Sequence, residues 1–373
     1  MEWYRMHKMS NLGDQQEETW IRKSKNKFDE FNVEMFLGKK ANLSNFKKNT
    51  VESIKENLKY YKESREKLYK IPNSEKELVS NCPITGISID KCSELVNIYG
   101  AEYVKTPDTG HVFLKYRASE KAINNFYIND AIYSTTYTNK DFIENRMNSI
   151  YVPWLKWTIE AYKKEYGKEP KKILDVGAGA GSFVEACRRA GYIADGIELS
   201  KSSRKFALDN WNLELDGRDF NEIYMEYEGY DIVTFWGLLE HTTNPSSIVD
   251  KANQIVSKSN NGGMVISYVP RIESLSSAVQ ILNNETILRH MDPLGHIMIF
   301  SDASIAELYY SNGLQPRVAW YYGMDLYETL MQFGNRTNDY RNFLETSEFQ
   351  VELQQYIDEN KFCDGIVLVG VPK

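Results

Sequence analysis

A strand that runs into a glycine-rich loop constrains the fold of this chain more than any other feature. The apolar strand 172–176 leads into a loop that contains Gly177, Gly179 and Gly181. Glycine tolerates positive φ and lets the backbone approach a ligand without a Cβ in the way. The helix expected from about Ser182 to Ala190 points its N-terminal amides at the same ligand. The pattern therefore predicts an α/β domain with a ligand at this loop.

An acid at the end of the next strand narrows the class of ligand. The strand 193–198 ends in Glu198, 21 residues after Gly177, a spacing that delivers a carboxylate to the hydroxyls of a ribose. Nicotinamide proteins share this device, but their fingerprint has Gly or Ala where Ser182 stands. They also usually have an apolar residue at the position of Asp175. A nicotinamide oxidoreductase is therefore disfavoured.

A later strand, 231–236, followed by Gly237 to His241, completes the pattern. Together these segments resemble the class I S-adenosylmethionine-dependent methyltransferases. The nearest group contains the bacterial ubiquinone-biosynthesis O-methyltransferases and the deoxysugar C-methyltransferases, and the resemblance covers roughly residues 151–313. It implies an α/β, Rossmann-like sheet of seven strands whose last strand is antiparallel, which a dehydrogenase lacks. We expect strands at 172–176, 193–198, near 213–215, 231–236, 263–269, 316–322 and 365–371.

The resemblance also implies which residues hold S-adenosylmethionine. Glu198 takes the ribose hydroxyls, and Asp219 accepts from the adenine amino group. The simpler alternatives are a surface acid at the strand end for Glu198 and an acid that starts a turn for Asp219. The full set of expected cofactor contacts is Asp175, Gly177, Gly179, Gly181, Glu198, Leu199, Asp219, Phe220, Trp236, Gly237, Tyr137 and Arg146.

Catalytic residues are harder to predict than cofactor contacts. Methyl transfer from a sulfonium mostly requires positioning, and a base is needed only if the acceptor must lose a proton. His241, beyond the fourth expected strand, and His296, in a G-H-I-M-I-F-S stretch, are the candidate bases; a structural role is the alternative for both. In ubiquinone-related enzymes an E-x-x-E-H stretch can hold a divalent metal. Here Gly237 replaces its first acid, so no metal is assigned.

The regions outside the catalytic core give weaker signals. Residues 1–79 are expected to form a polar, helical extension, because residues 51–61 have the apolar spacing of an amphipathic helix. Residues 119–150 are expected to form a helical cap over the cofactor. Residues 151–373 would then be the methyltransferase domain, with a helical insertion at about 326–360.

Residues 80–118 have the outline of a zinc ribbon. Two C-P-x-C-G turns would be present if Thr85, Thr106 and Thr109 were cysteines. A neutral hydroxyl is a poor zinc ligand beside a thiolate, so we expect the ribbon shape without its metal. Several sugar methyltransferases of the resembling group carry such a ribbon.

Composition sets limits on the function. The net charge of −7 argues against broad nucleic-acid binding, and no apolar run approaches the ~20 residues of a membrane span. Four cysteines do not make a disulfide framework, so a cytoplasmic location is expected. The sequence thus predicts a methyltransferase that acts on oxygen or carbon of a small molecule, with a carbohydrate favoured. A quinone or polyketide O-methyltransferase, a non-catalytic cofactor-binding partner and a homodimer all stay open.

Overall fold

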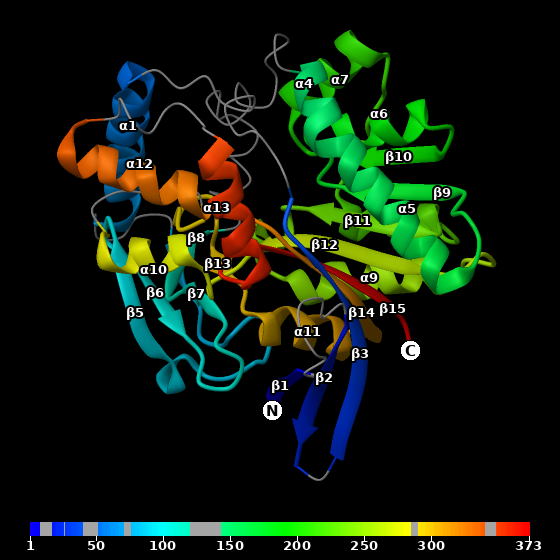
Figure 1. The fold of residues 1–373 in the computed structure, drawn as a ribbon, viewed down its shortest axis with the longest axis horizontal. Coiled ribbons are helices and arrows are strands. Elements are labelled where there is room, and N and C mark those ends of the chain that lie inside the picture. The colour runs from blue at the N-terminus through cyan, green and yellow to red at the C-terminus, as the bar shows by residue number, and fades with distance from the viewer. Residues whose placement is uncertain are drawn as a thin grey trace.

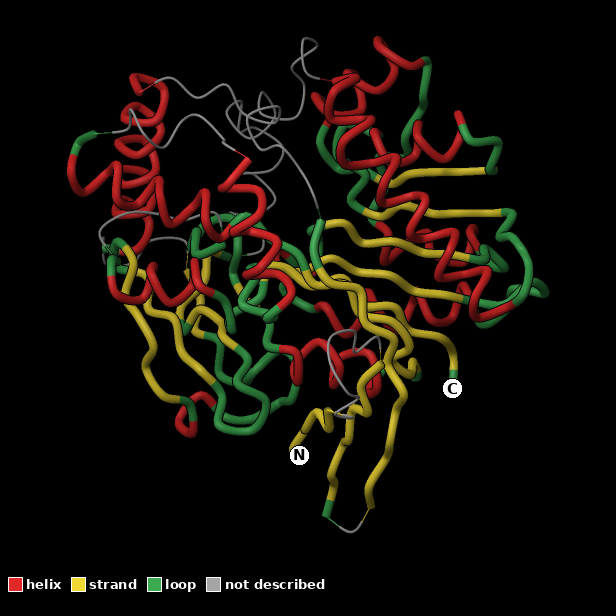
Figure 2. The backbone as a smooth tube through the Cα atoms, in the orientation of Figure 1, coloured by secondary structure: helices red, strands yellow, loops and turns green. Residues whose placement is uncertain are grey.

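The computed structural model describes residues 1–7, 17–25, 27–39, 51–70, 76–119, 143–284, 290–339 and 348–373. Within these residues the central element is a nine-stranded sheet with the order β1-β2-β3-β14-β15-β12-β11-β9-β10 (Figures 1 and 2). Its strands are β1 (Glu2–His7), β2 (Glu17–Ser24), β3 (Lys27–Leu37), β9 (Lys172–Val176), β10 (Ile193–Ile197), β11 (Ile232–Trp236), β12 (Met264–Pro270), β14 (Leu314–Tyr321) and β15 (Gly365–Pro372).

The predicted α/β methyltransferase sheet is confirmed by this order. Strands β10, β9, β11 and β12 run parallel, and β15 is antiparallel to both of its neighbours, β12 and β14. The third expected strand, near 213–215, is the exception. It is reduced to a single parallel bridge between Ile197 and Asp216, because the chain turns away at Gly217 and begins a short helix, α8 (Phe220–Ile223).

Helices cover both faces of the central strands, so β9, β11 and β12 are buried on both sides. In β9, Ile173 contributes to the core beneath α5 (Val152–Tyr166) and α6 (Ser182–Arg189). Its neighbour Leu174 points to the opposite face, into the core beneath α9 (Pro245–Val256) and α11 (Asp302–Ser311). This alternation is the period-2 geometry of a strand. None of the helices in the described ranges combines the length and apolarity that crossing a membrane requires.

The expected helical extension over residues 1–79 is wrong for most of the residues that the structure describes in this range. Strands β1, β2 and β3 form an antiparallel meander, and β3 pairs parallel with β14; helix α1 (Val51–Tyr69) follows. The physical reason is visible in β3, where Phe31, Val33 and Met35 alternate with polar residues. That pattern has period 2, which suits a half-buried strand and not a helix.

Polar contacts fix this meander to α11. Arg22 Nε donates to Glu307 Oε2 over 2.8 Å, and the Trp3 indole donates to the same oxygen over 2.9 Å. Beyond β3, the Gly38 N–H donates to the Tyr321 carbonyl (2.7 Å), while the Trp320 indole donates to the Gly38 carbonyl (3.0 Å). The meander therefore adds one more parallel strand whose carboxyl end lies beside that of β14.

The segment that resembles a zinc ribbon is rich in strands. It contains β5 (Ser93–Ile98), β6 (Ala101–Lys105), β7 (Val112–Leu114) and β8 (Tyr116–Ala118), and β8 pairs with β4 (Lys76–Leu78), which lies just before the segment. Strand β7 also pairs with β13 (Met298–Ile299), which follows His296 in the chain. Val104, Val112, Phe113 and Leu114 are buried in its core. The segment is thus joined to the loop that carries one of the two candidate catalytic histidines.

Two further regions are partly described. Of the expected cap over 119–150, the structure describes α4 (Ile143–Arg146) and the helical turn Met147–Tyr151, and Tyr137 lies outside the described residues. Helices α12 (Asp325–Thr337) and α13 (Glu348–Glu359) stand where the helical insertion was expected. In Figure 1 both lie on the side of the molecule opposite α6 and α7 (Lys201–Trp211).

Candidate active site

The glycine loop has the backbone that the sequence led us to expect. Gly177, Gly179 and Gly181 have φ values of 76°, 53° and 74°, which residues with a side chain rarely adopt. A Cβ at Gly181 would lie 2.8 Å from Leu213 Cδ2, whereas a Cβ at Gly179 would meet nothing within 4 Å. Gly181 is therefore needed for packing, and Gly179 leaves open space above the loop on the side where a ligand would approach.

Glu198 ties this loop to the end of β10. Its Oε2 accepts from the Gly179 N–H over 2.8 Å, and its Oε1 accepts from the Ser200 N–H over 2.7 Å. Burial raises the pKa of Glu198, and these two backbone N–H groups oppose the rise. Each carboxylate oxygen has more than one lone pair. The side chain can thus hold the loop and still accept bonds from two hydroxyl groups.

Asp175 is a buried carboxyl group at the base of the loop. It is 3% exposed, and the Thr234 hydroxyl of β11 donates to its Oδ1 over 2.8 Å. Burial raises the pKa of Asp175 to about 7, and the bond from Thr234 opposes this. The expected contact with the cofactor would therefore come from a side chain that also links two neighbouring strands.

The three residues expected near adenine come from two segments, Leu199 from the loop after β10 and Asp219 and Phe220 from the start of α8. Asp219 caps α8, since its Oδ1 accepts from the Asn221 N–H over 2.8 Å. This is the turn-starting role that was the alternative for Asp219, and it leaves the second carboxylate oxygen available for an adenine contact. Phe220 is buried against Phe235, whereas Leu199 is 44% exposed. Arg146, expected in the cap, is the last residue of α4.

Aromatic side chains gather where β11 and β12 end. Trp236 stacks on Trp154 of α5 with ring centroids 4.3 Å apart, and Tyr268 lies beside Trp154 and Tyr322. The next residue, Gly237, has φ of 74°, and its N–H donates to the Tyr268 carbonyl over 3.1 Å. Trp154, Trp236, Tyr268 and Tyr322 thus form an aromatic wall at the carboxyl edge, where open α/β sheets bind ligands. Gly237 borders this wall.

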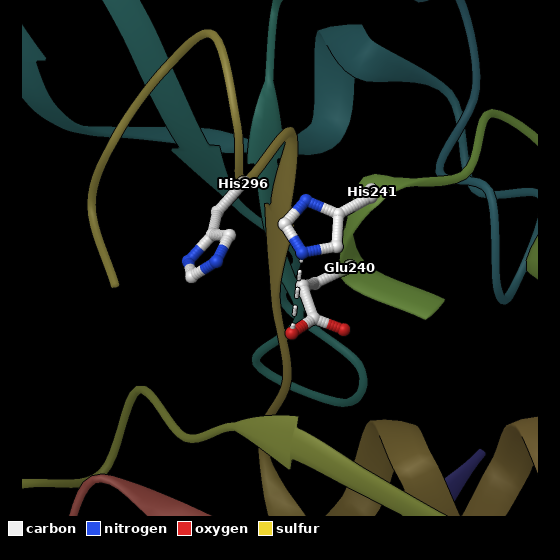
Figure 3. A group of neighbouring side chains, drawn as sticks. All are labelled: Glu240, His241 and His296. Atoms are coloured by element: carbon white, nitrogen blue, oxygen red, sulfur yellow. Dashed lines mark ion pairs between the residues drawn. The ribbon is translucent and has the colours of Figure 1, made fainter. Parts of the chain in front are cut away.

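The two candidate catalytic histidines lie side by side (Figure 3). The ring centroids of His241 and His296 are 4.7 Å apart. Nδ1 of His241 is 2.7 Å from the Gly295 carbonyl, and Nδ1 of His296 is 3.0 Å from the His290 carbonyl. A carbonyl only accepts, so each Nδ1 carries the proton and each Nε2 carries the lone pair. Burial lowers the pKa of His241 to about 4, so this ring is neutral at pH 7.

Glu240 completes a set of donors that suits a divalent metal. The ligand atoms of Glu240, His241 and His296 all lie within 4.8 Å of one another. Two imidazole nitrogens and a carboxylate are a donor set found in zinc and non-haem metal sites. No metal was assigned from the sequence, because Gly237 removes the first acid of the expected motif. His296 comes from a different segment, so local spacing gave no sign of it.

Of the three threonines at the ligand positions, Thr106 and Thr109 bond to neighbouring polar groups, whereas the buried Thr85 hydroxyl has no hydrogen-bond partner among the described residues. The hydroxyl oxygens of Thr106 and Thr109 are 3.2 Å apart, and the His111 N–H donates to the Thr106 hydroxyl over 3.0 Å. Gly86 and Gly110, at corresponding places in the two turns, both have φ of 69°. Within residues 76–119, Cys, His, Asp and Glu side chains form no group of three at metal-ligand distance.

We expect the purified chain, made without a histidine tag, to contain well below one zinc per chain. Structural zinc requires about four good donors, and three of the four positions are hydroxyls. Replacing Thr85, Thr106 and Thr109 together by cysteine should create a site that binds about one zinc per chain, because the turns are preserved. Elemental analysis of both proteins measures this. Stoichiometric, chelator-resistant zinc in the unaltered protein would contradict it.

Two residues of this region were missed at the level of sequence. Trp154 lies in the first turn of the amphipathic helix α5. An aromatic residue in such a helix normally indicates core packing. Lys39 follows β3, and its ammonium lies 5.6 Å from the ring centroid of Trp154 and 5.4 Å from that of Tyr322. A helical N-terminal extension could not have placed Lys39 there. Recognising the period-2 pattern of β3 would have been the necessary signal.

Comparison with known proteins agrees with this geometry. Residues 153–318 match the family model of a methyltransferase domain. The ubiquinone biosynthesis O-methyltransferase of Actinobacillus pleuropneumoniae is 34% identical over 105 residues, which are 25% of this chain and 44% of that protein. The protein of the same name from Hydrogenovibrio crunogenus is 33% identical over 140 residues, which are 34% of this chain and 56% of that protein. The chain thus spans about half the length of these relatives.

Several solved structures are similar over most of their own length, and two of them serve as examples. A plantazolicin methyltransferase has a TM-score of 0.45 and 16% identity, covering 68% of this chain and 96% of that one. The magnesium protoporphyrin IX methyltransferase of Synechocystis PCC 6803, crystallised with bound SAH, has a TM-score of 0.43 and 11% identity, covering 68% of this chain and 100% of that one.

Proposed function

We propose that this chain, which carries a methyltransferase domain over residues 153–318, transfers a methyl group from S-adenosylmethionine to a small-molecule acceptor. The observation that carries the proposal is the link between Glu198 and the glycine loop, which brings a carboxylate and an open backbone edge together at the carboxyl ends of β9 and β10. Ribose hydroxyls and a methionine chain require such a combination. S-adenosylmethionine itself supplies an already activated methyl group.

The roles of the residues follow from their places. Glu198 would accept from the ribose hydroxyls, and the open space at Gly179 would admit the methionine chain. Asp219 and Phe220 would contact adenine from the loop after β10. Trp236 and Gly237 would border the end of the cofactor that carries the methyl group. His241 and His296 would accept a proton from the acceptor through Nε2, or hold a metal together with Glu240.

The acceptor is proposed at a coarser level. The relatives are named for O-methylation in ubiquinone biosynthesis, which favours an acceptor oxygen and a quinone-type precursor. The carbohydrate acceptor favoured by the ribbon-like segment has no support from these relatives and remains the second candidate. A cofactor-binding protein without catalysis is a third candidate, and a methyl-transfer assay with phenolic and sugar acceptors separates it from the other two.

We expect the Glu198→Ala variant to bind S-adenosylhomocysteine about 10–150-fold more weakly than the unaltered protein, which corresponds to roughly 1.5–3 kcal/mol for hydrogen bonds to a charged group. The loss has two sources, the ribose contact and the anchoring of the loop through Gly179. Isothermal titration calorimetry measures the affinity. Glu214→Ala, which removes an exposed acid from the nearby loop, is the matched control and should change nothing. Equal affinity of the two variants for S-adenosylhomocysteine would show that Glu198 does not bind the ribose hydroxyls.

A further inference from the structure

Three side-chain donors at the aromatic wall have no acceptor among the residues that the structure describes. The ammonium of Lys39 makes no hydrogen bond or ion pair with the residues that the structure describes; its contacts there are the rings of Trp154 and Tyr322. The indole nitrogens of Trp154 and Trp236 are buried and likewise have no hydrogen-bond partner in the described ranges. Buried donors are normally satisfied, and a lysine is seldom buried without a counter-charge.

The environment of Lys39 also disfavours its charged form. Burial lowers the pKa of Lys39 to about 8. The ring faces supply a weak attraction for the ammonium, but they do not replace a carboxylate. An isolated buried cation costs free energy unless it is paired, so this arrangement is suited to a partner that brings negative charge.

The position of Lys39 indicates whether the expected anion belongs to the cofactor or to the methyl acceptor. Lys39 reaches the aromatic wall from β3 and β14, whereas the glycine loop lies at the end of β9. Four strand steps separate β14 from β9 in the sheet order, at about 4.8 Å each. Trp236, at the end of β11, lies between the two sides. Lys39 therefore faces the wall from the side opposite the loop that would hold the methionine chain.

We propose that Lys39 binds a carboxylate of the methyl acceptor, with the ring of that acceptor lying against the aromatic wall. This inference rests on the proposed methyltransferase function and names the chemical class of its acceptor: a planar, apolar group that carries an anion. The indole N–H groups of Trp154 and Trp236 provide further donors for the oxygen atoms. The meander β1–β3, which the sequence did not reveal, then has a defined use, because it delivers a cation to the acceptor side of the site.

The test uses benzoate and its neutral isostere benzamide as probes. Each is titrated into the full-length protein, with and without saturating S-adenosylhomocysteine, and followed by ligand-observed NMR. We expect benzoate to bind at least about 10-fold more tightly than benzamide, as a charge-assisted bond implies. In Lys39→Met that preference should disappear. Lys156→Met, which removes an exposed lysine from the same helix as Trp154, should keep it. No preference for benzoate in the unaltered protein would overturn the proposal.

The cofactor also carries a carboxylate, so a second measurement separates the two sources. Lys39→Met should bind S-adenosylhomocysteine within about twofold of the unaltered protein. A loss of tenfold or more for S-adenosylhomocysteine, without a loss for 5′-methylthioadenosine, which lacks the amino-acid part, would assign Lys39 to the cofactor and overturn the acceptor role. Failure of the unaltered protein to bind S-adenosylhomocysteine overturns the methyltransferase function instead, and the benzoate titration without cofactor still decides the role of Lys39.

The thermal stability of Lys39→Met serves as the control for correct folding. Because Lys39→Met removes a half-buried charge that has no counter-charge among the described residues, its thermal midpoint should equal or exceed that of the unaltered protein. A purely structural lysine would lower the midpoint when replaced. A lower midpoint combined with an unchanged preference for benzoate would therefore overturn the proposal.

Discussion

Replacing His296 or His241 by alanine is expected to lower methyl-transfer turnover by roughly 10²–10⁴-fold while leaving affinity for S-adenosylhomocysteine unchanged. The reason is the shared tautomer. In both rings Nδ1 donates to a backbone carbonyl, of Gly295 for His241 and of His290 for His296, so Nε2 carries a lone pair. Turnover is measured on the acceptor that the unaltered protein methylates, and affinity is measured by calorimetry.

His111→Gln is the matched control. His111 belongs to the ribbon-like segment, is fully buried, and has its Nδ1 3.1 Å from the hydroxyl of Ser304 in α11. The variant should keep turnover. Treatment with a chelator distinguishes metal binding by the histidines from general base catalysis. Loss of turnover that a divalent metal restores indicates a metal site formed with Glu240. Turnover that resists chelation indicates a general base. Full turnover in both alanine variants would mean that the reaction proceeds by positioning alone.

Arg271→Met should lower the free energy of unfolding by about 3–5 kcal/mol, as breaking one side of a buried ion pair does. Arg271 is 1% exposed, and its Nε donates to Asp302 Oδ1 over 2.6 Å. Arg5 also lies 2.8 Å from Asp302. Burial opposes the charged form of Asp302, but Arg271 and Arg5 outweigh it and hold the pKa below its usual value. Urea denaturation measures the change.

The double variant Arg271→Met, Asp302→Asn is the control for this pair. It leaves no buried carboxylate uncompensated, so it should be less destabilised than the sum of the two single variants. The sign of the pH dependence follows from the lowered pKa of Asp302: the stabilisation is present above the ordinary pKa of a carboxyl group and is lost as the pH falls through the folded-state value. Additive single effects would show that Asp302 is not paired as described.

The sequence was most informative where local pattern and function coincide. The glycines at 177, 179 and 181 could be recognised because their positive φ is a local requirement, and the strands around them because their apolar runs are short and well bounded. The cap of α11 is equally local, since the Ser301 side chain accepts from the Ser304 N–H three residues on. Such features depend on neighbours in the chain, so a single sequence contains them.

The features that the sequence did not reveal depend on distant segments. The strands β1–β3 were expected to be helical although β3 carries a period-2 pattern, and no local signal says that β14 will offer an edge to β3. His296 lies beside Glu240 and His241 through contacts between distant segments, since the Ile297 N–H donates to the Glu240 carbonyl over 3.1 Å and Nδ1 of His241 donates to the Gly295 carbonyl over 2.7 Å. Lys39 was missed for the same reason. The part of the site expected to meet the acceptor is assembled from separate segments, whereas the cofactor side comes largely from one.

The same pairing of β3 with β14 has a consequence during synthesis. The Trp320 indole and the Gly38 carbonyl that it bonds are 282 residues apart in the chain. Strand β3 is therefore made long before β14, and the edge of β3 that faces β14 has no partner until synthesis has passed residue 321. Contacts of such long sequence separation form slowly, and unpaired strands are prone to aggregate while they wait. We therefore expect the yield of folded protein to depend on chaperones that shield the nascent N-terminal segment, and to suffer when translation pauses before residue 321.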